Sequence, residues 1–202
     1  MKNDFKKHLK IFNNLNVYFW IAGGAIYDFF NDQTPNDIDV FFKSQKDVKK
    51  AEELLRRKGF KLILNRNVGA LYQSKDGIKY DLLYVSKTPQ DLFYNFFDYS
   101  VCCAAIDNKN NFIYHENYFE HCDKKELHYV ESCPKSDQVK QKRLKKMINK
   151  GFSIDSQNLT LWLEKMDSDK KILKKRSFNM RDIPHMKSKN LKFNIIKTKL
   201  KD

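Results

Sequence analysis

Two aspartates separated by a single residue are the positions best suited to chemistry in this 202-residue chain. Asp37 and Asp39 lead directly into the apolar run Val40-Phe41-Phe42, which is typical of a strand. Because side chains alternate along a strand, both carboxylates project from the same face, about 6–7 Å apart. Carboxylates this close repel one another unless a cation lies between them, and Mg²⁺ prefers such oxygen ligands together with substrate phosphates. The pair therefore predicts a magnesium site.

A pair of glycines precedes the first aspartate by fourteen residues. Gly23-Gly24 follows the strand-like run 17–22 and precedes a helix-like segment. A diglycine at a strand-to-helix turn lets the backbone approach a ligand and present N–H groups to an anion. Together with the aspartates it predicts a phosphate cradle facing the metal site. The alternative is a tight turn beside a solvent-exposed strand face.

A third carboxylate, Asp81, lies within the strand-like run 78–85. That run follows an expected hairpin with its turn at 75–77, where Asp-Gly favours a tight connection. A charged side chain among apolar neighbours is costly unless it is paired or metal-bound. We therefore expect Asp81 to complete the metal site and to accept a proton during the reaction, the alternative being an exposed acid near a strand end.

The order of these motifs resembles the nucleotidyltransferase superfamily, specifically the head domain of bacterial-type CCA-adding enzymes and poly(A) polymerases. Their pattern G-G-x-V-R-D is mirrored at 23–28, and their P-x-D-x-D at 35–39. The family's D-F-[ST]-[IV]-N-A-[LM]-A appears as 98–105, and its basic helix with a G-F-x-I-D turn as 142–155. The resemblance covers roughly residues 15–156, and only the first motif is highly specific.

The resemblance implies an α/β (α+β) fold: a polymerase-beta-like nucleotidyltransferase head with a mixed sheet, followed by a basic helical neck. It also implies that Asp37 and Asp39 bind two catalytic Mg²⁺ ions, while the diglycine turn holds the triphosphate of ATP or another NTP. Asp28 either orients that loop or complements the helix dipole. The residues assigned to catalysis and metal are Asp37, Asp39 and Asp81, and those assigned to the nucleotide are Gly23, Gly24, Asp28, Lys142 and Lys145.

The chain also departs from the family pattern. Tyr27 stands where the family has Arg, and Cys102 or Cys103 stands where it has Asn. The base-reading Glu-Asp-x-x-Arg motif has no clear counterpart, the nearest candidate being 164–170. We therefore still expect nucleotidyl transfer, but we do not expect specificity for adding C, C and A.

Basic residues are concentrated in the last third of the chain. Of the formal net charge of +14, residues 135–202 contribute 20 Lys and Arg against 7 acids, whereas residues 1–134 hold 19 against 18. This asymmetry favours a polyanionic partner, which we expect to be tRNA or another structured RNA. The alternative is a lysine-rich solvated surface. The residues assigned to RNA are Arg143, Lys146, Lys174, Lys175 and Arg176.

Local patterns predict three segments: a nucleotidyltransferase head at 1–134, a basic helical neck at 135–176 and a basic arm at 177–202, the last without a firm pattern. In the head, strands and helices alternate early and hairpins come later, so we expect helices on one face of a mixed sheet. The expected helices are 5–15, 25–31, 45–58, 88–97, 139–150 and 156–175, and the expected strands are 17–22, 38–43, 60–64, 69–73 and 78–85.

Other features restrict the class of protein. No apolar run is long enough to span a bilayer, and the start lacks a signal-peptide core, so we expect the cytoplasm, or a host cytoplasm if the protein is viral. The four cysteines are consistent with a reducing compartment. A homodimer is a separate expectation about the partners of the protein. A cluster of histidines and cysteines has spacing that fits no zinc motif: His115, His121, Cys122, His128 and Cys133.

The sequence therefore predicts a metal-dependent enzyme that transfers a nucleoside monophosphate from an NTP to an RNA 3′ end. Two alternatives stay open. One is transfer to a small molecule or a protein hydroxyl, and the other is a non-catalytic RNA-binding protein on the same fold.

Overall fold

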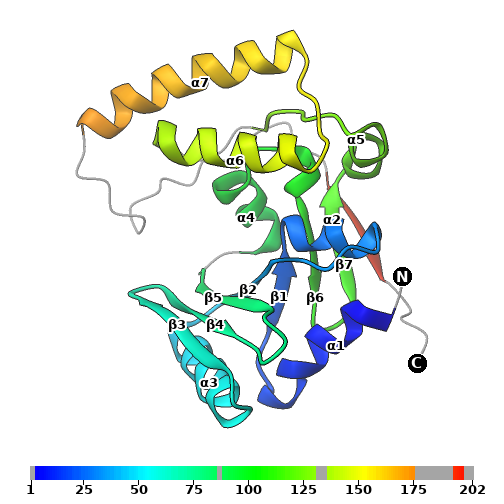
Figure 1. Ribbon diagram of the computed structural model, residues 1–202, viewed down its shortest axis with the longest axis vertical. Helices are drawn as coiled ribbons and strands as arrows, with labels where there is room; N and C mark the ends of the chain where they lie inside the picture. Colours follow the sequence, from blue (N-terminus) through cyan, green and yellow to red (C-terminus); the bar gives the residue numbers. More distant parts are fainter. Residues whose placement is uncertain (1–2, 86–87, 131–135, 176–192, 198–202) are drawn as a thin grey trace.

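A central mixed β-sheet organises the protein (Figure 1). The computed structural model describes residues 3–85, 88–130, 136–175 and 193–197. Within them, eight strands form one sheet in the order β3-β4-β5-β2-β1-β6-β7-β8. The strands are β1 (Phe19–Ala22), β2 (Asp37–Phe42), β3 (Lys61–Arg66), β4 (Gly69–Gln73), β5 (Lys79–Tyr84), β6 (Ala104–Asp107), β7 (Asn111–His115) and β8 (Phe193–Lys197).

Seven α-helices among the described residues surround this sheet. They are α1 (Asn3–Phe12), α2 (Gly24–Phe30), α3 (Gln45–Arg57), α4 (Pro89–Phe96), α5 (Tyr118–Lys124), α6 (Asp137–Asn149) and α7 (Ser156–Lys175). Two short 3₁₀ turns, η1 (Asn13–Leu15) and η2 (Ser100–Cys102), complete the list. The helices and strands predicted from local patterns are confirmed, with ends that differ by a few residues.

Local chemistry explains where the head helices begin and end. Ser44 caps α3 by accepting a hydrogen bond at its Oγ from the backbone N–H of Asp47, at 3.0 Å. Gly59, with φ +79°, follows its end in the left-handed region that favours glycine. A capping box between Thr88 and Asp91 starts α4, with Pro89 in the first turn. These ends fix the lengths of the loops that carry the site.

Helices cover both faces of the sheet, so the expectation of helices on one face is wrong. All four residues of β1 are buried, because Phe19 and Ile21 face one side and Trp20 and Ala22 the other. The first side packs against α1, α2 and α3 in one apolar cluster. The second side packs against α4, α6 and α7 in another cluster. A strand that is apolar on both faces requires this second layer.

The C-terminal tail contributes a strand that the sequence pattern does not predict. β8 pairs antiparallel with β7, from Asn111 opposite Lys197 to His115 opposite Phe193. Ile195 and Ile196 are exposed, so apolar burial does not mark this segment. The remainder of the expected arm, 177–192 and 198–202, lies outside the described residues.

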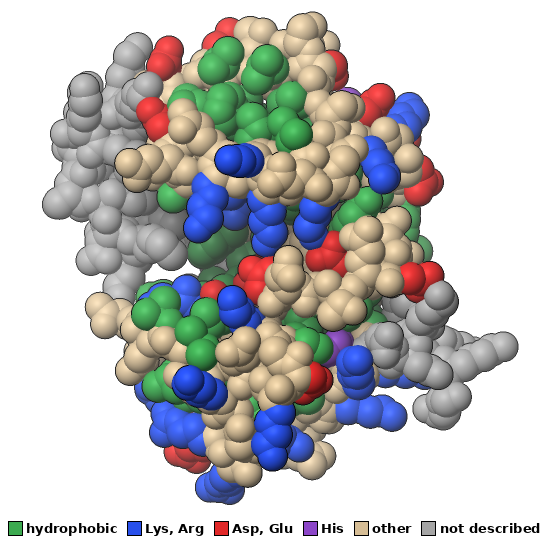
Figure 2. Space-filling view, in the orientation of Figure 1, with side chains coloured by type: hydrophobic (Ala, Val, Ile, Leu, Met, Phe, Trp, Pro, Cys, Tyr) green, Lys and Arg blue, Asp and Glu red, His purple; other side chains and the backbone are tan. Residues whose placement is uncertain are grey.

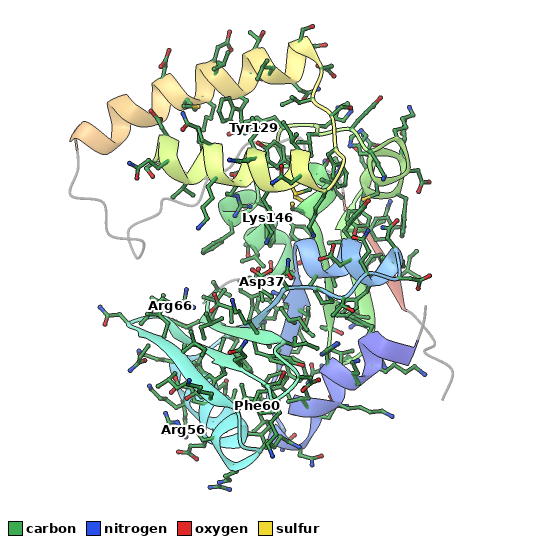
Figure 3. The ribbon with its side chains drawn as sticks, in the orientation of Figure 1. Asp37, Arg56, Phe60, Arg66, Tyr129 and Lys146 are labelled. Carbon is green, nitrogen blue, oxygen red and sulfur yellow. The ribbon has the colours of Figure 1, made fainter. Side chains whose placement is uncertain are left out.

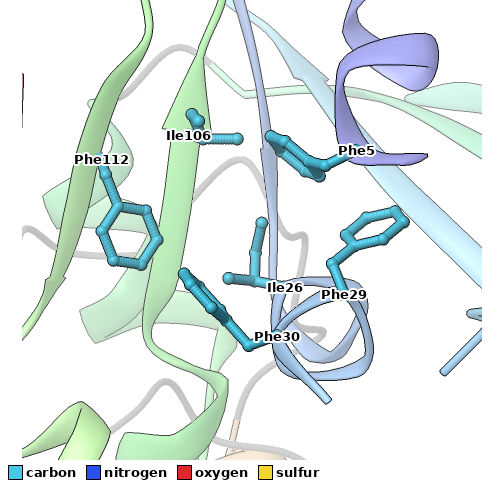
Figure 4. A pocket seen from close by; sticks show the side chains of 6 residues that line it. All are labelled: Phe5, Ile26, Phe29, Phe30, Ile106 and Phe112. Carbon is cyan, nitrogen blue, oxygen red and sulfur yellow. The ribbon is translucent and has the colours of Figure 1, made fainter. Parts of the chain in front are cut away.

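A small pocket lies between α1, α2 and the strands β6 and β7 (Figure 4). Its lining has no polar side chain, and one lining residue, Phe30, is exposed. Such a pocket offers no group to bind or orient a polar substrate. The lining residues are Phe5, Ile26, Phe29, Phe30, Ile106 and Phe112.

Gly69 provides a test of how tightly the sheet is built around the site. Its φ is +156°, and a Cβ placed there would lie 1.8 Å from the backbone oxygen of Leu82 on the neighbouring strand. We expect Gly69→Ala to lower the free energy of unfolding by about 3 kcal/mol or more, measured by urea denaturation. Gly77→Ala is the matched control, since Gly77 also has positive φ (+87°) but nothing within 4 Å of its Cβ. Equal losses in the two variants would contradict this packing.

Candidate functional site

Three carboxylates converge on one face at the centre of the sheet. β2 and β5 are parallel, and Asp39 is the register partner of Asp81. Residues in register on parallel neighbours share a face, and Asp37 lies two residues before Asp39 on that same face. The three aspartates therefore face the side of the sheet that α4 and α6 cover. The structure brings together the three residues that the sequence assigns to the metal.

Burial and mutual repulsion raise the pKa values of Asp39 and Asp81. The pKa of Asp39 is raised to about 7, first by burial and then by the charges of Asp37 and Asp81. Lys146 and Arg143 oppose this shift. Burial also raises the pKa of Asp81, against the lowering effect of Arg66. Such shifts are typical of carboxylates assembled for function.

Three cationic side chains at α6 form ion pairs with aspartates of the head. Arg143, Lys146 and Lys150 follow the spacing i, i+3, i+7, which places them on one face of the helix. Figure 2 shows Lys and Arg side chains opposite Asp and Glu across a hollow in the surface, and Figure 3 shows Lys146 directed toward Asp37. The ion pairs are Arg143 Nε with Asp98 Oδ2 (2.5 Å), Lys146 Nζ with Asp37 Oδ1 (3.2 Å) and Lys150 Nζ with Asp28 Oδ1 (2.5 Å).

A fourth cation reaches the acids from the opposite side of the site. Arg66, at the end of β3, pairs with the Asp81 carboxylate. Neither Arg66 nor Lys150 was predicted from sequence. The helical spacing of Lys150 relative to Arg143 and Lys146 could have indicated that it belongs to the site. No local sequence pattern indicates that Arg66 does.

The diglycine turn borders both the carboxylates and the cations. Gly23 caps α2 with φ +86°, and a Cβ there would meet Phe97 at 3.0 Å and Asp39 Oδ2 at 3.6 Å. A Cβ on Gly24 would lie 3.9 Å from Lys150 Nζ. The turn thus needs glycine at position 23, and its two residues lie between the acidic and the basic parts of the site.

The remaining assigned residues lie elsewhere. Lys142 and Lys145 are exposed on α6, whereas Arg143 and Lys146, which the sequence assigns to RNA, pair with Asp98 and Asp37. Lys174 and Lys175 are the last two residues of α7, and Arg176 lies outside the described residues.

The donor set fits magnesium in its chemistry, since three carboxylates supply the hard oxygen ligands that Mg²⁺ prefers. Among the described residues, however, no three acidic, histidine or cysteine side chains are close enough together to enclose a metal ion. Lys146 and Arg66 are paired with two of the three carboxylates. Metal binding at this site therefore requires these two side chains to move away from Asp37 and Asp81.

Three of the histidines assigned to no function lie near one another, His115 and His121 buried and His128 partly buried. His121 and His128 stack with ring centroids 3.6 Å apart, and His121 Nδ1 shares a 2.7 Å hydrogen bond with Ser100 Oγ. His115 lies 6.4 Å from His121, and Cys133 is outside the described residues. Burial raises the pKa of the Cys102 thiol, which disfavours a nucleophilic thiolate.

Comparison with known proteins identifies relatives of two kinds. A family model described as Gabija anti-defense 2 family protein matches residues 1–125. The curated protein "Gabija anti-defense 2" of Bacillus phage SPbetaL7 is 29% identical over 103 residues, which cover 50% of this chain and 26% of that protein. The chain thus spans about a quarter of the curated relative it matches.

Solved structures of CCA-adding enzymes share the fold. The Thermotoga maritima CCA-adding enzyme complexed with tRNA has a TM-score of 0.62 at 15% identity, covering 83% of this chain and 43% of its own. A complex of a CCA-adding enzyme with CTP has a TM-score of 0.64 at 14% identity, covering 87% and 46%. The nucleotidyltransferase fold expected from sequence is confirmed. Membership of the CCA-adding or poly(A) polymerase family gains no support from the matching family model.

Repulsion within the carboxylate cluster predicts that Asp39 lowers stability. We expect Asp39→Asn to raise the free energy of unfolding by about 1 kcal/mol at pH 8 without metal, as measured by urea denaturation. The gain should shrink at pH 5, because the raised pKa of Asp39 leaves its carboxyl already protonated in the folded protein. Asp76→Asn, in the exposed β4–β5 turn, is the control. A less stable Asp39→Asn protein would refute the repulsion.

The stacked histidines predict a loss of stability in acid. Burial, followed by the charges of His128 and His115, lowers the pKa of His121 to about 4 from its usual 6.5, while Glu120 and Glu126 act in the opposite direction. His121 is neutral when folded, so its contribution is complete above pH 6.5 and is lost as the pH falls from 6.5 toward 4. Urea midpoints of the wild type should fall over this range more steeply than those of His121→Gln. Parallel pH profiles would show that His121 has no part in the loss.

Proposed function

The chain belongs to the Gabija anti-defense 2 family, and we propose that it is a metal-dependent nucleotidyltransferase that moves a nucleoside monophosphate from an NTP to a hydroxyl group. The observation that carries this proposal is the convergence of three carboxylates beside a diglycine turn. Repelling acids on one strand face are kept together where cations and phosphates are to be bound. The nucleotidyltransferase fold of the structural relatives supports the same reading.

In the proposed mechanism, Asp37, Asp39 and Asp81 would hold two Mg²⁺ ions, which would supply neutralisation of the charge that develops during the transfer. The acceptor oxygen forms a bond to the α-phosphorus, and the bond to pyrophosphate breaks. Asp81 accepts the proton of the acceptor hydroxyl. The Gly23-Gly24 turn, with Asp28 beside it, borders the triphosphate.

We favour an RNA 3′ end as the acceptor, as in tRNA or another structured RNA. Helix α6 presents Lys142 and Lys145 to solvent, and Lys146 of the same helix pairs with Asp37. A backbone of phosphates lying along α6 would therefore bring its terminal hydroxyl near Asp81. In this proposal 1–134 is the catalytic head, 135–176 a basic neck and 177–202 a basic arm, with Arg143, Lys146, Lys174, Lys175 and Arg176 as further candidates for RNA contacts.

A second acceptor is favoured by the family itself. The name of the curated phage relative refers to counter-defence and not to RNA processing. Transfer of a nucleotide to a hydroxyl of a Gabija defence component, in the host cytoplasm, would use the same site and the same reaction. In this reaction the acceptor is a hydroxyl group of a protein instead of a hydroxyl group of RNA. Pyrophosphate is released in both cases.

Labelling of a host-cell extract tests the proposal and separates the acceptors. We expect the protein, with Mg²⁺ and each α-³²P-labelled NTP, to label one class of macromolecule. Asp37→Asn and Asp39→Asn should reduce labelling by at least a hundredfold, because the lost carboxylates no longer hold the metal. Asp76→Asn, a surface substitution in the β4–β5 turn, should label as the wild type does.

The nature of the product decides between the acceptors. Label sensitive to ribonuclease, with an acceptor affinity that falls steeply with added salt, indicates RNA. Label that survives ribonuclease and is removed by protease indicates a protein hydroxyl. Wild-type labelling by Asp39→Asn would refute catalysis at this site. RNA binding without any labelling by the wild type would instead indicate a non-catalytic RNA-binding protein.

A further inference from the structure

Lys150 occupies a position in the site that no sequence motif assigns. Its Nζ lies 2.5 Å from Asp28 Oδ1 and 5.9 Å from the centre of the Tyr27 ring. The side chain is 19% exposed, so the ammonium is partly withdrawn from water. A charged group with little solvent is stable only beside anions or a π-face, and Lys150 has both.

The end of the neck helix is built to hold Lys150 at this point. α6 ends at Asn149, with Lys150 as its C-cap; Gly151, whose φ is +85°, then turns the chain so that Phe152 is buried. The ring of Phe152 packs against Tyr27 of α2 with centroids 4.9 Å apart. The contact fixes the last turn of α6 against the helix that follows the diglycine. Tyr27 stands where the G-G-x-V-R-D pattern has Arg. The cation beside Tyr27 and Asp28 in this protein is Lys150, at the end of α6.

The two glycines connect Lys150 to the carboxylates. A Cβ on Gly23 would lie 3.6 Å from Asp39 Oδ2, and a Cβ on the next residue, Gly24, would lie 3.9 Å from Lys150 Nζ. The acidic cluster and the ammonium thus lie along one short stretch of backbone that carries no side chain. A polyphosphate with metal ions at the aspartates would extend along this stretch toward the ammonium.

We propose that Lys150 binds the terminal phosphates of the incoming nucleotide, so that the neck helix supplies a triphosphate-binding cation to the head. The ammonium has three N–H donors, and it donates to phosphate oxygens in addition to Asp28. This proposal rests on the proposed nucleotidyl transfer and extends it by naming the phosphate ligand. It also implies that nucleotide affinity depends on the packing of Phe152 against Tyr27.

Binding of Mg²⁺·ATP and of AMP, measured by isothermal titration calorimetry on the full chain, tests the proposal. We expect Lys150→Gln to weaken Mg²⁺·ATP binding about tenfold or more, because a charge-assisted hydrogen bond is lost, and to leave AMP binding within about twofold. Lys150→Arg should recover most of the ATP affinity, since it retains the cation. Lys124→Gln is the matched control: Lys124 is an exposed lysine on α5 that pairs with Glu120 at 2.7 Å.

A role for Lys150 as a mere partner of Asp28 gives a different result. In that case Lys150→Gln would lower the thermal midpoint and weaken ATP and AMP together, which would overturn the proposal. Wild-type ATP affinity in Lys150→Gln would also overturn it. If the wild-type protein bound no Mg²⁺·ATP, the proposed function would fail and Lys150 would lose its ligand. Loss confined to ATP, with the thermal midpoint retained and with recovery in Lys150→Arg, supports the phosphate role alone.

Discussion

Electrostatic repulsion among Asp37, Asp39 and Asp81 is the constraint to which the surrounding structure responds. The parallel pairing of β2 with β5 sets Asp39 beside Asp81, and strand periodicity adds Asp37 on the same face. Burial strengthens the repulsion, as the raised pKa of Asp39 shows. Lys146 from α6 and Arg66 from β3 approach from opposite sides and pair with two of the acids. The docking of the neck on the head is therefore partly electrostatic.

These ion pairs suit a site that exchanges its cations. Two Mg²⁺ ions carry a charge of about +4 and an NTP about −4, so binding both changes the net charge of the site little. In the proposed function, Mg²⁺ ions at the carboxylates would displace Lys146 and Arg66, and the released cations would then lie close to the phosphates that accompany the metal. Asp37 and Asp81 would thus each have a cationic partner before and after binding, which avoids the cost of an unpaired charge.

Local patterns predict most elements of the head but not β6, β7 and α5, and the limits of these patterns are physical. Capping residues and strand alternation predict α3, β2 and β5, and the apolar neighbours of Asp81 point to its place in the cluster. The rotation of α6 could not be predicted, because charged residues surround the helix and its buried side includes a lysine, Lys140, as well as Met147. Pairing of β8 with β7 joins segments about eighty residues apart, and Arg66 reaches Asp81 only through the β3–β4–β5 register. Contacts of that kind have no local signal.

The departures from the CCA-adding pattern are consistent with one rearrangement of the site. Tyr27 packs against Phe152 with ring centroids 4.9 Å apart, and the ammonium of Lys150 lies 5.9 Å from the centre of the Tyr27 ring. Cys102 and Cys103 are buried and pack in the core beneath the neck, where a small apolar side chain fits better than an amide. Both positions therefore contribute to the apolar contact between the head and the neck. If the proposed function holds, the end of α6 is part of the nucleotide site, and a change that loosens α6 should lower nucleotide affinity even when every residue of the head is intact.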